Sequence, residues 1–495
     1  MTRIPLLSDS RLIVAEPGED DLILRPPPPS ESLEDVGRAV RDAFDFPLAG
    51  EPLSRLVRPG GAATLVIEQP SLPIPGVQVG PRHTAIAAVA DELERLGAKQ
   101  ITILVAGGLL RRTSPREIGL LVPPDFRRRF KGRVIVHDTE ADDLVELGRT
   151  GNVTLRVNPA LVETDVVVTV TAAETVLHGG PSALVSASGR ESLRAAGALS
   201  LLETSASQGW RLAVETERLL AERVAVTGVS LALNAPRVAG PFAGYPNDQA
   251  AIDRLLNSRV RHLFQVAPGR LRERVLDRLP RELTAAAVYA GTPSVAHTEA
   301  LLRATVLKGV TLDEQLDALV VGIPPTTPWM PRERPNPVTA AYLGLGLAVR
   351  LWRNAPPVVE GGTVILLHPL PRRFPRPTQT PYRALFYDPR TARDSDAMRE
   401  AERAAMNDTR ALEDYRAGRA CHPLQPFLEW SACDATAHRL GSVIVAGCRD
   451  AFAARQLGFV PAHGIGAALQ MARGRGARRV GYLLAPPFFP LVLSA

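Results

Sequence analysis

The sequence predicts an α/β protein made of two doubly wound domains, with an active-site cleft between them. Short apolar strands alternate with helical segments, which is typical of parallel sheets covered by helices. The alternation occurs twice, with a break near Pro280. A length of 495 residues with 45% hydrophobic content can bury more than one core. We therefore expect one domain over residues 1–280 and a second over residues 281–495.

The elements of the first series follow from hydrophobic periodicity. Residues 11–24 have the pattern of short edge strands, and the proline run at residues 25–29 must be extended. Apolar residues then recur at helical or strand spacing. The expected helices are residues 32–44, 83–96, 115–130, 212–223 and 248–279, the last broken at 268–269, and the expected strands are residues 62–67, 100–106, 134–137 and 224–233.

The second series has the same alternation. The expected strands are residues 285–289, 316–321, 362–367, 442–446 and 480–484, and the expected helices are residues 294–307, 337–352, 394–418 and 464–473. Residues 369–389 are rich in Pro and Arg without periodicity, which favours a surface loop or a lid.

The stretch at residues 165–197 is the strongest candidate for a functional site. It begins with a buried Val-rich strand, and His178 follows at the carboxyl edge, where open α/β sheets bind ligands. A loop of small residues runs from Gly179 to Gly189, and a helix is expected to begin near Arg190. The backbone N–H groups of such a loop can hold an anion.

Composition excludes several classes of function. The net charge of +6 comes almost wholly from Arg, and no basic run is interleaved with aromatic residues, so nucleic acid is not an expected partner. No run reaches the roughly 18 apolar residues that a membrane span needs. Three irregularly spaced cysteines indicate a reducing compartment, and the first residues have no apolar signal region, so we expect a cytoplasmic protein.

Two readings of His178 stay open. It can serve as a general acid or base, or it can be a polar residue that caps the strand edge. Glu174 lies four residues earlier and can orient the imidazole. His368 also ends a predicted strand, in the second series, and a position facing His178 across the cleft is the less favoured interpretation.

Other polar clusters are weaker candidates. A structural turn is favoured for His137 and Asp138, because neighbours on a strand point to opposite faces. The set Cys421, His422, Cys433 and His438 has wide spacing and an adjacent proline, so no metal site is expected there. The segment HGIGAAL at residues 463–469 lacks the third glycine of a dinucleotide fingerprint.

Eight segments, taken in order, carry a resemblance to a known family. They read LVRPGGAATLVIEQPSLPIP, ITILVAGGLLRRTSPREI, VHDTEADDLVELGRTGNVTLRVNPALVETDVVVT, ETVLHGG, YAGTPSVAHTEA, DALVVGIPP, EGGTVILLHPL and FLEWSACDATAHRL. Their order resembles the nickel-dependent lactate racemase family over nearly the whole chain.

The resemblance implies two α/β domains with an active site between them. It also implies proton or hydride exchange at the carbinol carbon of a 2-hydroxy acid, supported by a pyridinium pincer nucleotide that holds nickel. His178 matches one catalytic histidine, Arg111 follows the position of the other, and Trp430 matches a tryptophan near the cofactor. We thus expect catalytic roles for His178, Arg111 and Glu174, and cofactor binding by Gly179, Gly180, Gly189, Arg190 and Trp430.

Several family positions are altered in this sequence. An Asp-His-Thr-Arg-Pro segment of the family reads Gln69-Pro70-Ser71-Leu72-Pro73, and the second catalytic histidine falls on Leu110. The tethering lysine falls on Glu191, and no His follows within the next fifty residues to ligate nickel. The substrate lysine of the second half falls on Tyr342 or Leu343.

Two functions remain possible from the sequence. The first is a racemase or epimerase relative that acts on a small 2-hydroxy acid, without a covalently tethered nickel-pincer cofactor and without a protein metal site. The second is a non-catalytic or repurposed relative that binds a small anionic ligand or a partner in the same cleft. Both predict a small anionic ligand.

Overall fold

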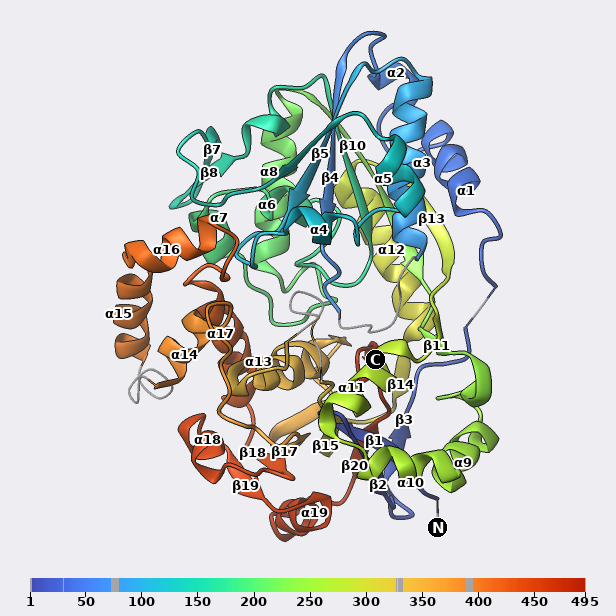
Figure 1. Cartoon of the computed structure of the whole chain (residues 1–495), viewed down its shortest axis with the longest axis vertical. Helices are drawn as coiled ribbons and strands as arrows, with labels where there is room; N and C mark the ends of the chain where they lie inside the picture. Colours follow the sequence, from blue (N-terminus) through green and yellow to red (C-terminus); the bar gives the residue numbers. More distant parts are fainter. Residues whose placement is uncertain are drawn as a thin grey trace.

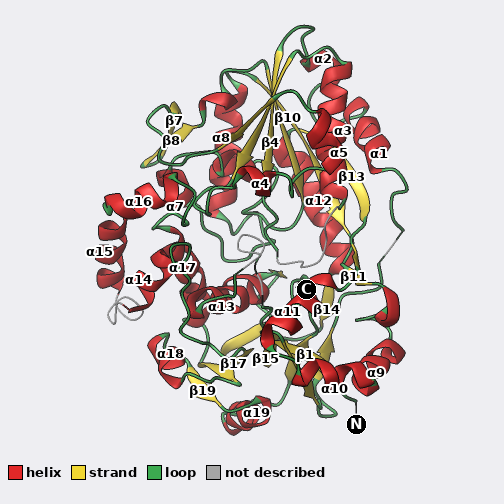
Figure 2. Cartoon of the chain, in the orientation of Figure 1, coloured by secondary structure: helices red, strands yellow, loops and turns green. Residues whose placement is uncertain are grey.

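The protein contains two six-stranded sheets at opposite ends of the molecule, with helices and loops between them (Figures 1 and 2). The computed structural model describes residues 2–29, 31–72, 80–325, 327, 333–387 and 395–494. In the described part, no helix is long and apolar enough to cross a membrane.

The first sheet has the strand order β13-β10-β9-β4-β5-β6. Its strands are parallel except β13, which pairs with β10 in the antiparallel direction. Their bounds are β4 Ala62–Glu68, β5 Gln100–Ala106, β6 Arg133–Val136, β9 Val166–Ala172, β10 Ala225–Leu233 and β13 Ala285–Gly291. Val-rich strands of this kind require cover on both faces.

Both faces of the first sheet are covered by helices. Leu65 and Ile67 of β4 pack into one core with α1 (Val36–Asp45) and α3 (Pro81–Arg95). Val66 points to the other face and packs with α6 (Ser182–Val185) and α8 (Gln208–Ala221). This alternation follows from the two-residue period of a strand. Helix α12 (Pro293–Lys308) lies against β10 and β13.

The second sheet has the order β19-β18-β17-β15-β20-β3, and all its pairings are parallel. The bounds are β3 Leu22–Leu24, β15 Leu316–Gly322, β17 Val358–Leu367, β18 Ser442–Ala446, β19 Val460–Ala462 and β20 Val480–Leu483. Helix α17 (Gln425–Ala437) packs on the segment that follows α13 (Pro337–Ala341), and α19 (Ile465–Gly474) covers the other face.

Smaller sheets complete the strands. A three-stranded parallel sheet joins β14 (Val310–Leu312), β21 (Leu491–Leu493) and β16 (Trp352–Arg353). Three antiparallel pairs stand apart from it: β1 (Ile4–Ser8) with β2 (Arg11–Ala15), β7 (Val145–Thr150) with β8 (Val153–Val157), and β11 (Arg237–Val238) with β12 (Arg281–Glu282).

Sheet membership crosses the predicted boundary at residue 280 in both directions. β13 lies beyond that residue but forms an edge of the first sheet, whereas β3 lies near the N-terminus but pairs with β20 in the second. The expected strand at residues 285–289 is therefore present, but it does not begin the second sheet.

Three long predicted helices are divided in the structure. Pro123 and Pro124 separate α4 (Pro115–Ile118) from α5 (Pro124–Arg129), since proline lacks the N–H that a helix interior needs. Asp408 caps α16 (Thr409–Arg416) and separates it from α15 (Ser395–Met406). After α13 the chain continues as a π-helix at Tyr342–Leu347 and a 3-10 turn at Ala348–Arg350.

The remaining helices lie in connections. The predicted helix over residues 248–279 is present as α9 (Gln249–Asn257), α10 (Arg259–Val266) and α11 (Gly269–Arg278), and α18 (Ala451–Gln456) precedes β19. The predicted loop at 369–389 contains α14 (Thr380–Tyr387), and its residues 388 and 389 lie outside the described residues. Short helices α2 (Leu53–Leu56) and α7 (Arg190–Ala195) complete the set.

Candidate functional site

His178 lies just beyond the carboxyl end of β9, where the sequence placed it. β9 is buried along its whole length. The chain then turns back on itself through a bridge between Thr175 and His178. The Thr175 hydroxyl lies 3.1 Å from Nδ1 of His178, so the turn that ends the strand also fixes the imidazole ring.

A small polar cavity lies beside His178. It is lined by Glu68, Gln69, Ser71, Arg82, Val170, Thr171, Ala172, Glu174, His178 and Gly179. Its volume is about 10 Å³, which is near the minimum that one water molecule needs. Three charged side chains that are distant in sequence therefore meet at the ends of β4 and β9.

Glu174 is held by several donors at the wall of this cavity. One carboxylate oxygen accepts hydrogen bonds from the Ser71 hydroxyl, the Ser71 N–H at 2.8 Å and the Leu72 N–H at 3.2 Å. The other oxygen lies 3.2 Å from the Arg82 guanidinium, and both side chains are buried. Burial raises the pKa of Glu174, but Arg82, these hydrogen bonds and Lys308 outweigh it and hold the pKa below its usual value.

Glu68 is a second buried carboxylate in the same wall. It accepts hydrogen bonds from the Ser186 hydroxyl and from the Gly179 N–H, both at 2.7 Å. Burial raises the pKa of Glu68 to about 7, although these two hydrogen bonds and the charge of Arg82 act in the opposite direction. At neutral pH Glu68 is therefore present in both the protonated and the ionised form.

His178 is neutral at physiological pH. Burial lowers its pKa to about 4, the charge of Glu174 raises it and the charge of Arg82 lowers it. Within the described residues, no hydrogen bond joins Glu174 to His178, so the carboxylate influences the imidazole through its charge while Thr175 provides the contact.

The N–H groups of the small-residue loop have partners inside the protein. Gly179 donates to Glu68, Gly180 donates to the Thr171 hydroxyl at 3.0 Å, and Gly189 donates to the Arg156 carbonyl at 2.8 Å. The position at which an external anion was expected at Gly179 is thus taken by the carboxylate of Glu68.

His297 is a buried residue that the sequence argument did not single out. Its Nδ1 lies 3.0 Å from the Ser230 hydroxyl and its Nε2 lies 3.1 Å from the Thr175 carbonyl. The ring stacks on Trp210 with centroids 5.8 Å apart. It packs directly on Gly179 and Gly180, which both have positive φ. The two glycines are needed here because a β-carbon would collide with the imidazole.

Replacing Gly180 with Ala is expected to destabilise the fold by about 3 kcal/mol. The new β-carbon would lie 2.3 Å from Cβ of His297, at a backbone φ of 53°. The imidazole cannot retreat because Ser230 and Trp210 hold it. Urea denaturation of both variants measures the effect, with Gly197→Ala as the matched control because nothing lies within 4 Å of that site. Equal stability of the two variants would contradict the packing argument.

The other predicted site residues lie among different partners. Arg111 forms an ion pair with Glu117, and Arg190 lies 3.1 Å from Glu140. Trp430 is buried on α17 and lies beside Phe459, with centroids 6.3 Å apart. The cavity beside His178 is lined by His178, Glu174 and Gly179 from the predicted set, and by Arg82 and Glu68, which the sequence argument missed.

The family resemblance places the tethering position at Glu191, which is an exposed carboxylate on α7 and offers no amine for a covalently tethered nickel-pincer nucleotide. No group of three or more His, Cys, Asp or Glu that could hold a metal ion is found in the described ranges. One lysine does lie in the neighbourhood of the site, since Lys308 is buried and its charge acts on Glu174.

The remaining histidines have structural contacts. His137 contacts the Ser188 carbonyl at 2.9 Å and the Asn158 amide at 3.2 Å. His422 contacts Glu140 at 3.1 Å. His368 accepts a hydrogen bond from the Leu370 N–H.

His368 and His178 lie among different charges. Asp9 and Arg334 act on His368, whereas Glu174 and Arg82 act on His178.

Comparison with known proteins identifies the relationship. Residues 13–192 match the family described as the lactate racemase N-terminal domain. The solved structure of the lactate racemase apoprotein from Thermoanaerobacterium thermosaccharolyticum matches with a TM-score of 0.60 at 14% identity, covering 99% of this chain and 100% of that chain. A structure of a Thermotoga maritima protein matches with a TM-score of 0.48 at 10% identity, over 94% of this chain and 100% of that one.

No curated protein sequence matches this chain. The family resemblance expected from the sequence is confirmed over residues 13–192 by the matching family, and the two-domain α/β fold class is confirmed by the shared fold.

Proposed function

Because this chain is a lactate racemase-like protein by its N-terminal domain and its fold, we propose that it acts on a small 2-hydroxy acid as a racemase or epimerase, without a tethered nickel-pincer nucleotide. The observation that carries the proposal is the single cavity that brings His178, Glu68 and Arg82 together. These side chains supply a base, an acid and a cation.

Arg82 is the group that binds the substrate carboxylate in this proposal. A guanidinium matches a carboxylate in geometry and charge. The cavity has room for about one water molecule, so a 2-hydroxy acid enters only when the cavity widens. Arg111 is the less suitable cation, because it does not line the polar cavity and pairs with Glu117.

Inversion at a carbinol carbon requires one group to remove a proton and another to return one to the opposite face. His178 is neutral at physiological pH and can accept the proton. Glu68, with its pKa raised to about 7 chiefly by burial, can donate one. Two titratable groups whose pKa values are separated by their surroundings are suited to paired acid and base roles. Thr175 holds the imidazole during the transfer.

A second candidate function is a non-catalytic relative that binds a small anionic ligand. It is favoured by the position of Leu110, which replaces the family's second catalytic histidine, and by the low pKa of His178, which makes the imidazole a weak base. Anion binding needs only Arg82 and fixed hydrogen-bond donors, whereas racemisation needs proton transfer on two faces.

The two functions are separated by hydrogen exchange at C2 of D- and L-lactate in D₂O, followed by NMR. We expect exchange with the purified protein, and a loss of at least about 100-fold in His178→Gln and in Glu68→Gln, as removal of a general acid or base causes. His438→Gln is the matched control, since His438 is an exposed histidine on the surface. Stabilisation by lactate in a thermal melt should persist in His178→Gln.

Each outcome of this experiment is informative. Exchange that survives in both variants would contradict the assigned acid and base, and stabilisation without exchange would support the non-catalytic function. Absence of both would refute the two proposals together. In addition, the intact mass of protein made alongside cofactor-synthesis enzymes should equal that of the unmodified chain, and an added nucleotide on any lysine, including Lys308, would contradict the untethered site.

A further inference from the structure

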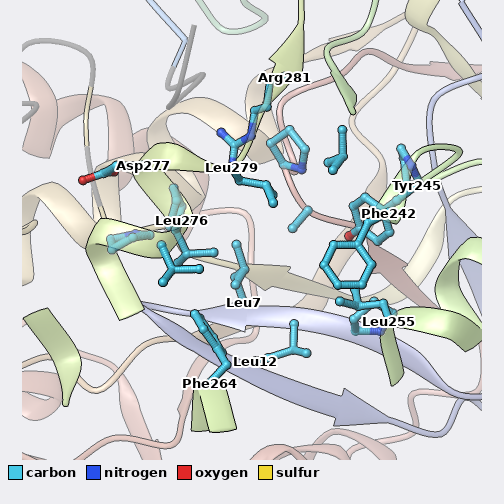
Figure 3. Close-up of a pocket in the computed structure, with 18 of the residues that line it drawn as sticks. Leu7, Leu12, Phe242, Tyr245, Leu255, Phe264, Leu276, Asp277, Leu279 and Arg281 are labelled. Atoms are coloured by element: carbon cyan, nitrogen blue, oxygen red, sulfur yellow. The ribbon is translucent and has the colours of Figure 1, made fainter. Parts of the chain in front are cut away.

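The protein has a second cavity, which is larger than the polar cavity beside His178. The two cavities share no lining residue. The second cavity is formed by the β1–β2 hairpin, helices α9 to α11 and four proline-containing loops (Figure 3). Its walls are Pro5, Leu7, Leu12, Pro236, Val238, Phe242, Tyr245, Pro246, Leu255, Val260, Arg261, Phe264, Val275, Leu276, Asp277, Leu279, Arg281, Pro324, Pro325, Ala485, Pro486 and Pro487.

The lining is almost wholly apolar and offers flat surfaces. Phe242, Tyr245 and Phe264 supply aromatic rings, and Figure 3 shows them around one space with Leu7 and Leu12. Proline rings from four separate loops supply further flat faces. Flat apolar walls of this kind favour an aromatic ring, which gains from offset or edge contacts with aromatic neighbours.

The size of the cavity indicates the size of its ligand. The volume is about 160 Å³, whereas protein interiors are normally close-packed and contain few voids larger than a water molecule. A dry apolar cavity of about 150 Å³ is known to accept benzene. The cavity is reached from the surface, because some of its lining residues are exposed, among them Val260 by 58% and Val275 by 46%. A ligand can therefore enter between α10 and α11.

The charged lining residues favour an anionic head group. Arg261 and Arg281 contribute two positive charges and Asp277 one negative charge. Asp277 lies at the periphery of the space in Figure 3, away from the apolar walls. Within the described residues, Nε of Arg261 is buried and has no hydrogen-bond partner. A buried donor without a partner is costly, and a bound carboxylate would satisfy it.

We propose that this cavity is a binding site for an aryl carboxylate, with the ring between Phe242, Phe264 and the proline faces and the carboxylate at Arg261. The site combines an apolar body of about one ring with a cation that has a buried, unpartnered donor, as small-ligand pockets combine apolar walls with a few polar groups. It is independent of the proposed function, since the two cavities have no residue in common.

The test is ¹⁹F NMR titration of the full chain with 4-fluorobenzoate and with 4-fluorobenzyl alcohol. The two probes share the ring and differ in charge. We expect the acid to bind about tenfold more tightly than the alcohol, which is the advantage of hydrogen bonds to a charged group. Lactate should not displace the acid, because the 2-hydroxy acid site lies elsewhere. Displacement by lactate would assign the signal to the polar cavity and overturn the proposal.

Two kinds of variant complete the test. In Arg261→Met the acid should bind only as tightly as the alcohol, while binding of the alcohol is unaffected, and Arg261→Leu should have the same effect if Arg261→Met does not fold. Arg278→Met is the matched control, because Arg278 is exposed on α11 and does not line the cavity. Val260→Trp fills the exposed mouth and should abolish binding of both probes. Equal binding of the two probes to the unmodified chain, or binding that survives in Val260→Trp, would overturn the proposal.

Discussion

Lowering the pH from 6.5 to 4 is expected to remove most of the protein's stability. Four buried histidines, His137, His178, His297 and His368, have pKa values that burial lowers to about 4. In the unfolded chain each returns to its ordinary pKa of 6.5. Between these two values the unfolded state binds more protons than the folded state, so stability rises with pH and is lost on acidification.

The expected size of this effect is large. At pH 4 each of these histidines lowers the free energy of unfolding by about 3 kcal/mol. The sum over several histidines approaches the whole free energy of unfolding of a domain. Glu68 acts in the opposite direction. The pKa of Glu68 is about 7 in the folded protein and 4.5 ordinarily. Its stabilisation of the folded state is therefore greatest below pH 4.5 and is lost as the pH rises to 7. Glu429, whose pKa burial also raises to about 7, acts in the same direction as Glu68. The four histidines outweigh these two carboxylates.

Guanidinium denaturation at pH 4.5, 5.5, 6.5 and 7.5 measures the dependence. In His297→Gln the number of protons taken up on unfolding, obtained from the slope of the unfolding free energy against pH, should fall by about one. His438→Gln should leave this slope unchanged, because the side chain of His438 is exposed. A stability that is flat from pH 4 to 6.5 would show that these imidazoles are not buried as neutral groups.

Replacing Arg82 with Met is expected to destabilise the fold by about 3 to 5 kcal/mol. The side chain of Arg82 is 15% exposed and that of Glu174 is 5% exposed, and they form an ion pair beside the polar cavity. Loss of the guanidinium leaves the Glu174 carboxylate buried with only its Ser71 and Leu72 donors. An uncompensated buried charge is far more costly than the pair is stabilising.

A double variant separates the two contributions. Arg82→Met combined with Glu174→Met should recover much of the lost stability, because neither charge then remains buried. Arg129→Met is the control, since Arg129 pairs with Asp91 at the surface with 51% and 44% exposure, where such pairs contribute about 1 kcal/mol or less. If Arg82→Met and Arg129→Met cost the same, the buried pair has no special role.

Strands were the part of the fold most readily predicted from the sequence. The expected strands at residues 100–106 and 442–446 coincide with β5 and β18. Both are short runs of Val, Ile and Ala bounded by polar or glycine residues, so local pattern and burial agree. Helices were predicted less well where proline or a capping residue interrupts an otherwise continuous pattern, as at Pro123 and Asp408.

Pairing between distant strands could not be predicted in the same way. Nothing in the three residues of β3 indicates that they join β20, and the antiparallel direction of β13 is set by its position at the edge of the first sheet. A strand that short carries too little pattern to specify its partner.

The location of the candidate site was predicted from the sequence, but several of the residues that form it were not. His178 was found because it follows a buried strand. Glu68 and Arg82 were missed because they are separated from it by about a hundred residues and look like ordinary charged residues in the sequence. His297 lies within the segment YAGTPSVAHTEA that carried the family resemblance, and the pair of glycines at 179–180 was the signal that something bulky packs there.

The placement of β3 has a consequence for how the chain is made. β3 is synthesised more than 450 residues before its partner β20. The last strand of the first sheet, β13, in contrast ends at residue 291. During translation the first sheet can therefore form early, while β3 stays unpaired until β20 has been synthesised. A gene divided after residue 280 would give two fragments that each lack an edge strand, so we expect both to aggregate when expressed alone.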